Sequence, residues 1–265
     1  MLRGLYSAAS GMDATLIEAD VIANNLANVN TPGYQPDKAV YSTFLNKLNS
    51  RINDSYSRNT SAGEFAERPL VGRIGTGVIM EGVHTGFRQG KLEHSSNPLD
   101  LSITGSGFFA VATEGGTRFT RNGSFTLNNE GMLTTLDGNM VLGQRYFDEP
   151  LAPIQLPRGK ELEIDEEGKI WIDKELVAQL AIRDFPKPYN ITKEGRDLLA
   201  LGGEEVKARD FVLEQGWLEK PDVSVVKEMV SLINAFRVYE ANSKSVTSND
   251  QLMAKAVNDV GRYVG

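Results

Sequence analysis

The most regular pattern of the chain lies in residues Val223–Val264, which read VSVVKEMVSLINAFRVYEANSKSVTSNDQLMAKAVNDVGRYV. From Val225 onward, positions spaced alternately by four and by three residues are apolar, except for Ser243 and Asp250. This spacing puts an apolar seam along one side of an α-helix, with the roughly 3.5-residue repeat of helices that wind around one another. We therefore predict a long helix whose seam is an assembly interface, formed by Val225, Met229, Leu232, Phe236, Tyr239, Val246, Met253, Val257 and Val260.

The N-terminal segment keeps the same rhythm without a polar exception. We predict a helix from Leu2 to about Ala27, which ends where asparagines, Pro32 and Gly33 favour a cap and a turn. Gly4 and Gly11 each cost this helix about 1 kcal/mol relative to alanine, so its order depends on packing against a partner. We predict that both chain ends pair as one coiled-coil-like unit. The N-terminal seam consists of Leu2, Leu5, Ala9, Met12, Leu16, Ala19, Ala23 and Leu26.

Each predicted helix also carries apolar residues beside its seam. Val226, Val230 and Ile233 form a second stripe at the start of the C-terminal helix, and Ile17 and Ile22 flank the N-terminal seam. An apolar stripe is usually core, and simple pairing of the two helices would explain their inner faces. Two helices alone cannot cover both stripes, and exposed stripes of this kind predict contacts with other subunits.

The C-terminal helix has one polar interruption, from Asn242 to Asp250, where only Val246 is apolar. Serine, threonine and asparagine have mediocre helix propensity. Because tertiary packing often overrides propensity, we expect a continuous helix with a polar patch. A bend, or polar contacts with another subunit, is the alternative.

Between the helical ends the pattern changes to a two-residue repeat. Leu99, Leu101 and Ile103 alternate with polar residues, which predicts a half-buried strand. Turn signals such as Asn122-Gly123 and Asp137-Gly138 separate further short β-prone segments. The predicted fold class is α+β, with long N- and C-terminal helices and an inserted antiparallel β-rich domain. The predicted strand segments include 108–111, 124–127, 140–142, 162–164, 170–172 and 177–185.

The pattern predicts three regions. A discontinuous terminal helical assembly domain comprises residues 1–34 and 216–265, and residues 71–215 form a β-rich outer domain. Residues 35–70 are a connector, which begins with an apolar patch from Val40 to Leu48 that could add one or two helical turns. Beyond this patch the connector has too little apolar surface to offset its ordering entropy, so we expect an extended or mobile stretch.

Composition argues against several classes of function. A net charge of −7, with no cluster of Lys and Arg, disfavours nucleic acid and anionic membranes as partners. The absence of cysteine excludes a disulfide framework, a thiolate zinc site and a cysteine nucleophile. Asp13, Glu18 and Asp20 interrupt the N-terminal segment, so we expect no cleaved signal peptide. No apolar run approaches the roughly 20 residues of a membrane helix.

The candidate chemical motifs favour structural explanations. Gly105-Ser106-Gly107 precedes an aromatic β-run rather than a helix, so we interpret it as a turn and not as a dinucleotide loop. His84 and His94 lack metal-ligand spacing, and residues 165–168 are typical of an acidic hairpin tip rather than a calcium loop. No motif pairs a nucleophile with a base. We therefore expect no metal, no cofactor and no small-molecule substrate, while the absence of a motif does not exclude catalysis.

Both ends of the chain resemble the bacterial flagellar rod and hook proteins. Residues 7–12 (SAASGM) and 21–34 (VIANNLANVNTPGY) are similar to the N-terminal signature of that family. Residues 215–219 (QGWLE), 226–230 (VKEMV) and 237–244 (RVYEANSK) are similar to its C-terminal signature. The signature positions are Asn24, Asn25, Leu26, Asn28, Pro32, Gly33, Tyr34, Gly216, Leu218, Glu219, Tyr239, Asn242 and Lys244.

The inserted part of the chain shares this resemblance, since residues 99–125 are similar to the rod proteins in particular. One departure follows Glu219. The family usually carries Ser-Asn-Val there, whereas this chain has Lys220 and then Pro221-Asp222-Val223. Asp222 or Ser224 can still cap the helix that follows.

The resemblance implies a non-enzymatic structural subunit of the flagellar basal-body rod, located in the cell envelope. Such proteins are exported unprocessed by the flagellar type III export apparatus. They assemble helically with themselves and with other rod and hook proteins into the axial drive shaft for motility. A flagellar hook or hook-associated subunit is the alternative within the family. From a different class, the alternative is a secreted β-domain enzyme or carbohydrate-binding module.

Overall fold

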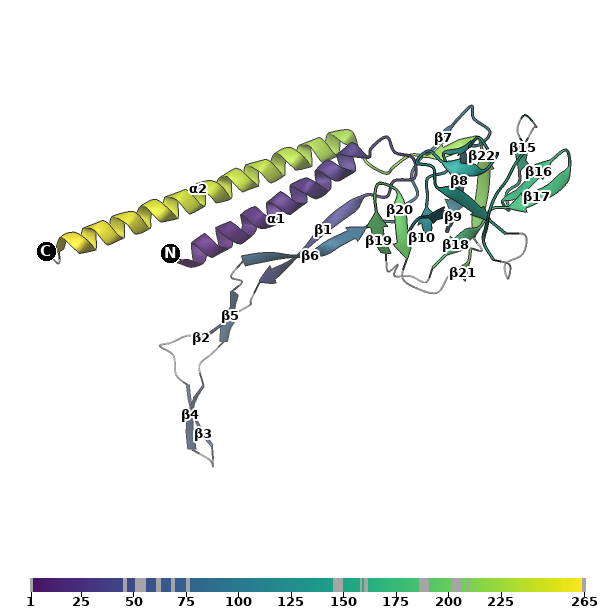
Figure 1. The fold of residues 1–265 in the computed structure, drawn as a ribbon. Helices are drawn as coiled ribbons and strands as arrows, with labels where there is room; N and C mark the ends of the chain where they lie inside the picture. The colour runs from purple at the N-terminus through teal and green to yellow at the C-terminus, as the bar shows by residue number, and fades with distance from the viewer. Residues whose placement is uncertain are drawn as a thin grey trace. The chain divides into compact units, whose positions relative to one another are not determined.

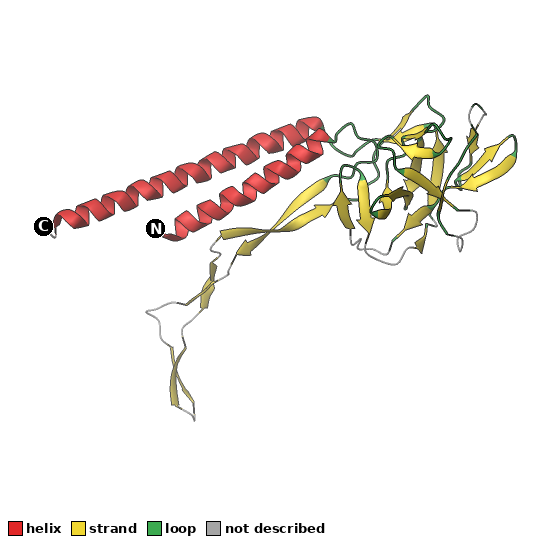
Figure 2. Cartoon of the chain, in the orientation of Figure 1, coloured by secondary structure: helices red, strands yellow, loops and turns green. Residues whose placement is uncertain are grey.

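The computed structural model has an α+β fold, as predicted (Figure 1). Helix α1 (Leu2–Ala27) and helix α2 (Val225–Tyr263) enclose a long run of β-strands in the sequence (Figure 2). The chain divides into two compact units, which are described separately. The described residues are 2–44, 47–50, 56–60, 63–67, 70–74, 77–144, 150–157, 159, 162–185, 191–201, 206–208 and 210–263.

The first unit comprises Met1–Asn24, Asp37–His84 and Val226–Gly265. In it α1 and α2 run in opposite directions, with both chain termini at the same end of the two helices (Figure 1). Coiled-coil packing along their length stays a prediction. Two-stranded sheets join β1 to β6, β2 to β5 and β3 to β4. The strands are β1 (Asp37–Phe44), β2 (Lys47–Ser50), β3 (Tyr56–Thr60), β4 (Gly63–Glu67), β5 (Leu70–Ile74) and β6 (Gly77–Thr85).

The second unit comprises Asn25–Pro36 and Thr85–Val225, and its strands are antiparallel. Its largest sheet has the order β11-β12-β13-β9-β10-β20-β19, with β14 on β13 and with β18 joining β9 and β21. A separate sheet has the order β15-β16-β17, and β22 pairs with β8 and β23 with β7. These last two pairs tie the segment before α2 to strands from the beginning of the same unit.

The strands of the second unit are β7 (Leu92–His94), β8 (Leu101–Gly105), β9 (Phe108–Thr113), β10 (Gly116–Thr120), β11 (Phe125–Leu127), β12 (Leu133–Thr135), β13 (Met140–Gly143), β14 (Ala152–Pro153), β15 (Leu162–Ile164), β16 (Lys169–Ile172), β17 (Glu175–Gln179), β18 (Ile182–Asp184), β19 (Ile191–Glu194), β20 (Leu198–Leu201), β21 (Val206–Lys207), β22 (Phe211–Gln215) and β23 (Trp217–Glu219). Each predicted strand segment overlaps at least one of them. Segment 177–185 contains the end of β17 and the whole of β18, and residues 180–181 separate the two strands.

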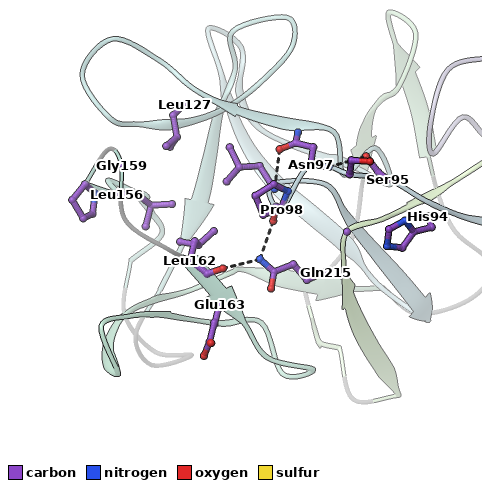
Figure 3. A pocket seen from close by; sticks show the side chains of 14 residues that line it. His94, Ser95, Asn97, Pro98, Leu127, Leu156, Gly159, Leu162, Glu163 and Gln215 are labelled. Carbon is purple, nitrogen blue, oxygen red and sulfur yellow. Dashed lines mark hydrogen bonds between the residues drawn. The ribbon is translucent and has the colours of Figure 1, made fainter.

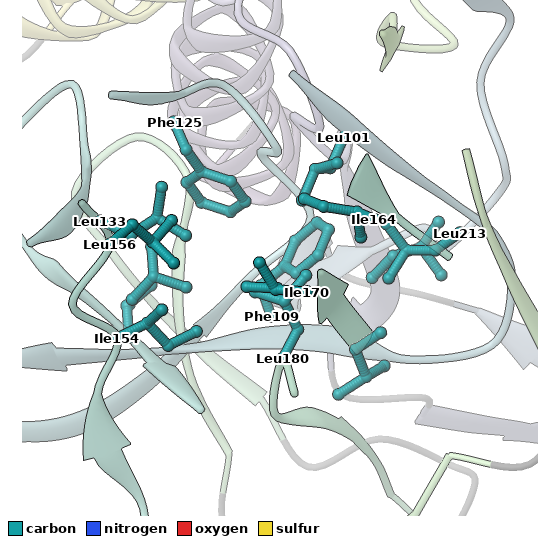
Figure 4. Packing of buried hydrophobic residues seen from close by; sticks show 14 of the residues in the cluster. Leu101, Phe109, Phe125, Leu133, Ile154, Leu156, Ile164, Ile170, Leu180 and Leu213 are labelled. Carbon is teal, nitrogen blue, oxygen red and sulfur yellow. The ribbon is translucent and has the colours of Figure 1, made fainter. Parts of the chain in front are cut away.

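The core of the second unit is built from the inward faces of these strands (Figure 4). Phe109 on β9 and Phe125 on β11 are buried, and their rings meet edge to face at 5.1 Å. Aliphatic side chains from β8, β12, β16 and β22 surround them. A second, smaller cluster on the other side of β9 contains Phe108, Phe119 and Phe185. Strand β9 is thus buried on both faces and forms the centre of the domain.

Strand β8 differs from the predicted half-buried strand at Leu99–Thr104. Not only Leu101 and Ile103 but also Asp100 and Ser102 are buried. The buried carboxylate of Asp100 accepts hydrogen bonds from Ser95 Oγ (2.5 Å) and Asn97 Nδ2 (3.0 Å). Asp100 can therefore be buried because residues 95–97 supply donors, which the alternation of residue types does not reveal.

The predicted turns are confirmed. Gly105 and Gly107 connect β8 to β9 with φ angles of +103° and +127°, a backbone region in which glycine is favoured. Residues 165–168 form the tip of the β15–β16 hairpin, where Gly168 N–H donates to the Asp165 carbonyl (3.0 Å). The carboxylate of Asp165 also accepts bonds from the backbone N–H groups of Glu167 and Lys169. This acidic loop is thus fixed by its own backbone.

The extra helical turns suggested after Val40 are wrong, because residues 37–44 form strand β1. β-Branched and aromatic residues such as Val40, Tyr41 and Thr43 favour a strand, and the Tyr41 hydroxyl donates to the Ala14 carbonyl of α1 (3.4 Å). The connector expectation also covers residues 45–46, 51–55, 61–62 and 68–69, which lie outside the described residues.

Candidate assembly surfaces

Helix α2 is unbroken from Val225 to Tyr263, including the polar stretch 242–250. Its second stripe is strongly exposed, with Val226 72%, Val230 52% and Ile233 52% accessible. The predicted seam of α2 divides into two groups. Val225, Met229, Phe236 and Val257 are exposed, whereas Leu232, Tyr239, Val246 and Met253 are half-buried. The side chain of Val260 lies outside the described residues.

The less exposed face of α2 is rotated relative to the predicted seam. It keeps the four-three spacing and shares four positions with the predicted seam, but its other three positions are small or polar residues. It consists of Leu232, Ala235, Tyr239, Asn242, Val246, Asn249 and Met253, of which only Ala235 is buried. Apolar periodicity alone missed Ala235, Asn242 and Asn249. The glycines of the N-terminal helix were the signal that could have found the two asparagines.

These asparagines lie against the two glycines of α1 within the first unit. A methyl group on Gly11 would lie 2.8 Å from Asn242 Nδ2, and one on Gly4 would lie 3.5 Å from Asn249 Nδ2. The two contacts are seven residues apart on each helix and run in opposite directions along the chain. They therefore define one antiparallel alignment of α1 and α2.

The predicted seam of α1 is likewise only partly covered. Ala19 is buried and Leu5, Met12 and Leu26 are half-buried, but Ala9, Leu16 and Ala23 are exposed. The side chain of Leu2 lies outside the described residues. The buried residues of the helix are mainly small, namely Ala8, Ala14, Ala19, Ile22 and Asn25. Small side chains allow neighbouring backbones to approach closely, which the search for large apolar residues could not anticipate.

The β1–β6 ribbon contacts another side of α1. Val78 N–H donates to Ser10 Oγ (3.3 Å), and a methyl group on Gly77 would collide with the same oxygen at 2.5 Å. Partial burial and the charge of Glu18 raise the pKa of Tyr41 from its ordinary 10.0 to about 12. Tyr41 is thus a neutral hydrogen-bond donor at physiological pH.

The signature residues at the end of α1 lie in the second unit. Gly33 (φ +68°) and Tyr34 are both buried, and the Tyr34 hydroxyl donates to Asn25 Oδ1 (2.9 Å). Thr31 N–H donates to the carbonyl of Asn28 (3.0 Å) and forms the turn before Pro32. In the described residues this signature is part of the chain's own packing rather than an exposed surface.

The C-terminal signature is divided between the two units. Gly216 has φ +76°, and its N–H donates to the Asp100 carbonyl (2.7 Å). Leu218 is half-buried and Glu219 is buried in β23. On α2, Tyr239 and Asn242 are half-buried and Lys244 is exposed. In the N-terminal signature, Asn24 is exposed and Leu26 and Pro32 are half-buried.

A cavity of about 760 Å³ in the second unit has a mixed lining that includes His94, Asn97, Leu127, Leu156 and Gln215 (Figure 3). Its polar groups already bind the protein itself. Gln215 Nε2 donates to the carbonyls of Pro98 and Leu162 at 2.9 Å each, and the His94 ring packs edge to face on Trp217. Within the described ranges, no three His, Cys, Asp or Glu residues cluster as metal ligands.

Neither described helix has a segment long and apolar enough to span a lipid bilayer. The exposed apolar surface of α2 and α1 is a further feature with potential for binding. The fold combines a self-contained β-domain with two long helices whose apolar residues are largely uncovered. This combination is typical of a structural subunit that assembles with neighbours.

Comparison with known proteins assigns the chain to a family. Residues 5–35 match the family described as "Flagella basal body rod protein". Residues 102–172 match the "Flagellar hook protein FlgE/F/G D1 domain", and residues 214–259 match the "Flagellar basal body rod FlgEFG protein C-terminal". The three matches fall on the two chain ends and on the β-domain.

Full-length relatives agree with these matches. The chain is 34% identical to the flagellar basal-body rod protein FlgG of Borreliella burgdorferi, over 97% of this chain and 98% of the relative. It is 32% identical to FlgG of Agrobacterium fabrum, over 95% and 97% of the two chains. It is also 28% identical to the flagellar hook-basal body complex protein FlhO of Bacillus subtilis, over 99% and 100%. The chain belongs to the flagellar basal-body rod protein family, and it is a structural subunit of that kind.

Proposed function

We propose that the protein acts only by assembly, polymerising helically with copies of itself and with other rod and hook proteins into the axial drive shaft. The single observation that supports this best is the second stripe on α2. Val226, Val230 and Ile233 lie on successive turns and are at least half exposed. An apolar ridge that contacts a different surface of the next copy, without closing a ring, generates an open filament.

The proposed assembly domain consists of residues 1–34 and 216–265, with residues 35–70 as the connector and residues 71–215 as the outer domain. Coiled-coil-like pairing of α1 and α2 would leave the second stripe for neighbouring subunits. The seam residues on both helices that are exposed in the single chain, such as Leu16 and Phe236, would also be covered in the polymer. Family membership supports a location in the flagellar basal body. Export by the flagellar type III apparatus, without a cleaved signal peptide, belongs to the same proposal.

Replacing the second stripe tests this function. In the variant Val226→Ser, Val230→Ser, Ile233→Ser, we expect a folded subunit that no longer supports motility or enters isolated basal bodies. A matched variant on the same helix, Lys227→Ser, Asn234→Ser, Glu240→Ser, changes three exposed polar residues and should stay motile. Motile cells with the first variant would refute the stripe as an assembly surface. Circular dichroism of each purified subunit checks that it is folded.

Removal of residues 2–26 separates assembly from the alternatives of an enzyme or a carbohydrate-binding module. A β-domain that acts alone keeps its activity after this deletion. An axial subunit loses polymerisation and motility instead. Cells that swim with the truncated chain would contradict the proposed role.

A further inference from the structure

The buried carboxylate of Glu219 is the centre of a network that joins distant parts of the second unit. Glu219 is only 3% exposed. Its Oε1 accepts a hydrogen bond from Gly90 N–H (2.8 Å), and its Oε2 lies 3.3 Å from Nη1 of Arg121. Its backbone carbonyl accepts the N–H of Gly33 (2.8 Å). Glu219, which precedes α2 in the sequence, thus holds a segment that follows α1.

The guanidinium of Arg121 compensates the charge of Glu219, and further contacts hold Arg121 in place. Arg121 Nη1 also donates to the Ile103 carbonyl (3.1 Å), and Nη2 donates to the Gly105 carbonyl. The guanidinium lies 5.4 Å from the centre of the Phe108 ring. A buried ion pair whose members have further hydrogen-bond partners is costly to break, since removal of one charge leaves the other uncompensated.

Gly33 makes this junction dependent on close backbone approach. A methyl group at Gly33 would lie 2.3 Å from the Arg121 carbonyl carbon and equally close to the Asn122 nitrogen. Both are backbone atoms, so no side-chain rotation can make room. The φ angle of +68° independently disfavours a side chain here. Only glycine allows residue 33 to lie against the β10–β11 turn and β23 as it does.

Further contacts hold the rest of this segment, which we name the strap (Asn25–Pro36). Lys193 Nζ donates to the Gln35 carbonyl (2.6 Å) and lies 4.4 Å from the centre of the Tyr34 ring. Arg88 N–H donates to Gln35 Oε1, and Gly86 N–H to the Pro36 carbonyl. The strap includes the last three residues of α1, and the Tyr34 hydroxyl donates to Asn25 Oδ1 within it.

We propose that the strap is clasped to the β-domain by the Glu219–Arg121 pair in the single, unassembled subunit. Glu219, Arg121 and Gly33 are then positioning residues that fix the end of α1 before polymerisation. Three of the segments that resemble the family meet at this clasp, namely the segment that follows α1, the β10–β11 turn and β23. The consequence for assembly rests on the proposed function, whereas the existence of the clasp does not.

Hydrogen–deuterium exchange of the full chain as a dilute monomer tests the clasp. We expect the Gly33 and Gly90 amides to exchange as slowly as those of β8 and β9, and the amides of residues 5–20 to exchange much faster. In Glu219→Gln, the charge is lost and only one terminal oxygen is left to serve both Gly90 N–H and Arg121, so exchange at Gly33 and Gly90 should rise on the order of tenfold or more. Strap amides that exchange as fast as residues 5–20 in the wild type would overturn the proposal.

Two further variants make the result specific. Glu214→Gln changes a carboxylate on β22 that accepts a bond from Thr104 Oγ1 outside the clasp, and it should leave strap exchange unchanged. Gly33→Ala keeps the buried charges, and it should release the strap while β8 and β9 stay protected. This variant answers the question if Glu219→Gln fails to fold. Unchanged strap exchange in Gly33→Ala would refute the role of this glycine in the clasp.

Motility of cells that carry Gly33→Ala tests the positioning role separately. We expect a soluble subunit with a protected β-domain, and loss of motility. Normal motility with a released strap would disprove the positioning role without affecting the proposed rod function. A second-stripe variant that loses motility with an intact clasp would uphold the rod function independently.

Discussion

The two units of the chain satisfy their apolar and polar groups in opposite ways. In the second unit, Phe109 and Phe125 are fully enclosed, and the buried charges of Glu219 and Arg121 find partners within the same chain. In the first unit, the long helix α2 has only Ala235 buried among its described side chains, and several large apolar residues are more than half exposed. The same sequence thus encodes a self-sufficient domain and an incomplete one.

This difference indicates where a single subunit obtains its stability. Apolar burial contributes about 25 cal/mol per Å² removed from water, and α2 removes little in the isolated chain. Helices without tertiary packing are marginal in water. The β-domain is therefore expected to fold alone, whereas the helices become fully ordered when neighbouring subunits cover them.

The largest expected contrast between the units is in proteolysis. Lys227, Arg237 and Lys244 on α2 are exposed, and trypsin should cleave the dilute monomer there first. Cleavage at Arg118 or Lys169 in β10 and β16 requires opening of the β-domain. We expect initial rates to differ by about a thousandfold or more, as measured by mass spectrometry of a time course. Equal rates at both sets of sites would show that the helices are ordered without neighbours.

The next largest effect is expected in the free energy of unfolding, when two phenylalanine substitutions are compared. Phe109→Ala removes a fully buried ring and should reduce the free energy of unfolding by about 3–5 kcal/mol in urea titrations. Phe236→Ala removes a ring that is 52% exposed and should change it by less than about 0.5 kcal/mol. Only the second variant should retain monomer stability while losing incorporation into basal bodies. Comparable destabilisation by both substitutions would mean that Phe236 is packed within the subunit.

The sequence predicted the second unit more completely than the surfaces of the first. Two-residue alternation and the glycine turns located the strands, because each strand obeys a local rule. The burial of Asp100 and the role of Glu219 were not predictable in this way. The partners of Asp100 are positioned by the geometry of a loop. The partners of Glu219 lie on segments distant in the sequence. Pairing across long separations leaves no periodic signal.

In the helices, periodicity predicted the existence of α1 and α2 but not the faces they use. Large apolar residues dominated the seam, yet the structure places Gly11 beside Asn242 and buries Ala8 and Ala14. Close approach of two helices depends on which side chains are absent, and absent side chains contribute nothing to an apolar count. The polar stretch 242–250 was recognised as unusual, and the glycines opposite it give it a physical explanation.

The Gly11–Asn242 contact predicts a smaller, coupled effect. Alanine normally stabilises a helix by about 1 kcal/mol relative to glycine, and Gly4→Ala should show this gain because its methyl group meets only ordinary contact. Gly11→Ala should gain less, since its methyl group must displace the Asn242 amide. Adding Asn242→Ala should restore the gain, with a coupling of about 0.5–1 kcal/mol. Thermal unfolding followed by far-UV circular dichroism measures the wild type, the single variants Gly4→Ala, Gly11→Ala and Asn242→Ala, and the double variant.

Equal stabilisation by Gly4→Ala and Gly11→Ala would contradict this contact. The comparison is internal, because both glycines lie on the same helix and both oppose an asparagine. It therefore separates close packing at one position from a general change in helix propensity. Absence of coupling in the double variant would show that the two helices separate in the monomer.

The smallest expected effect is a pH dependence at Tyr41, where the β1–β6 ribbon contacts α1. Its pKa is raised from 10.0 to about 12 in the folded chain, by partial burial and by the charge of Glu18. The unfolded chain therefore releases this proton first as pH rises. The contribution to stability is complete below pH 10.0, and it is lost as pH approaches about 12. Because Tyr41 is only half-buried, screening keeps the loss small.

Comparison of the wild type with Tyr41→Phe across this alkaline window isolates the effect. The wild type should lose slightly more helical stability than Tyr41→Phe above pH 10.0, as followed by urea unfolding. Glu18→Gln removes one cause of the raised pKa and should reduce the difference. If the two chains keep the same pH dependence up to about pH 12, the ribbon does not hold Tyr41 against α1 in solution. The first unit would then be even less ordered, relative to the β-domain, than its contacts indicate.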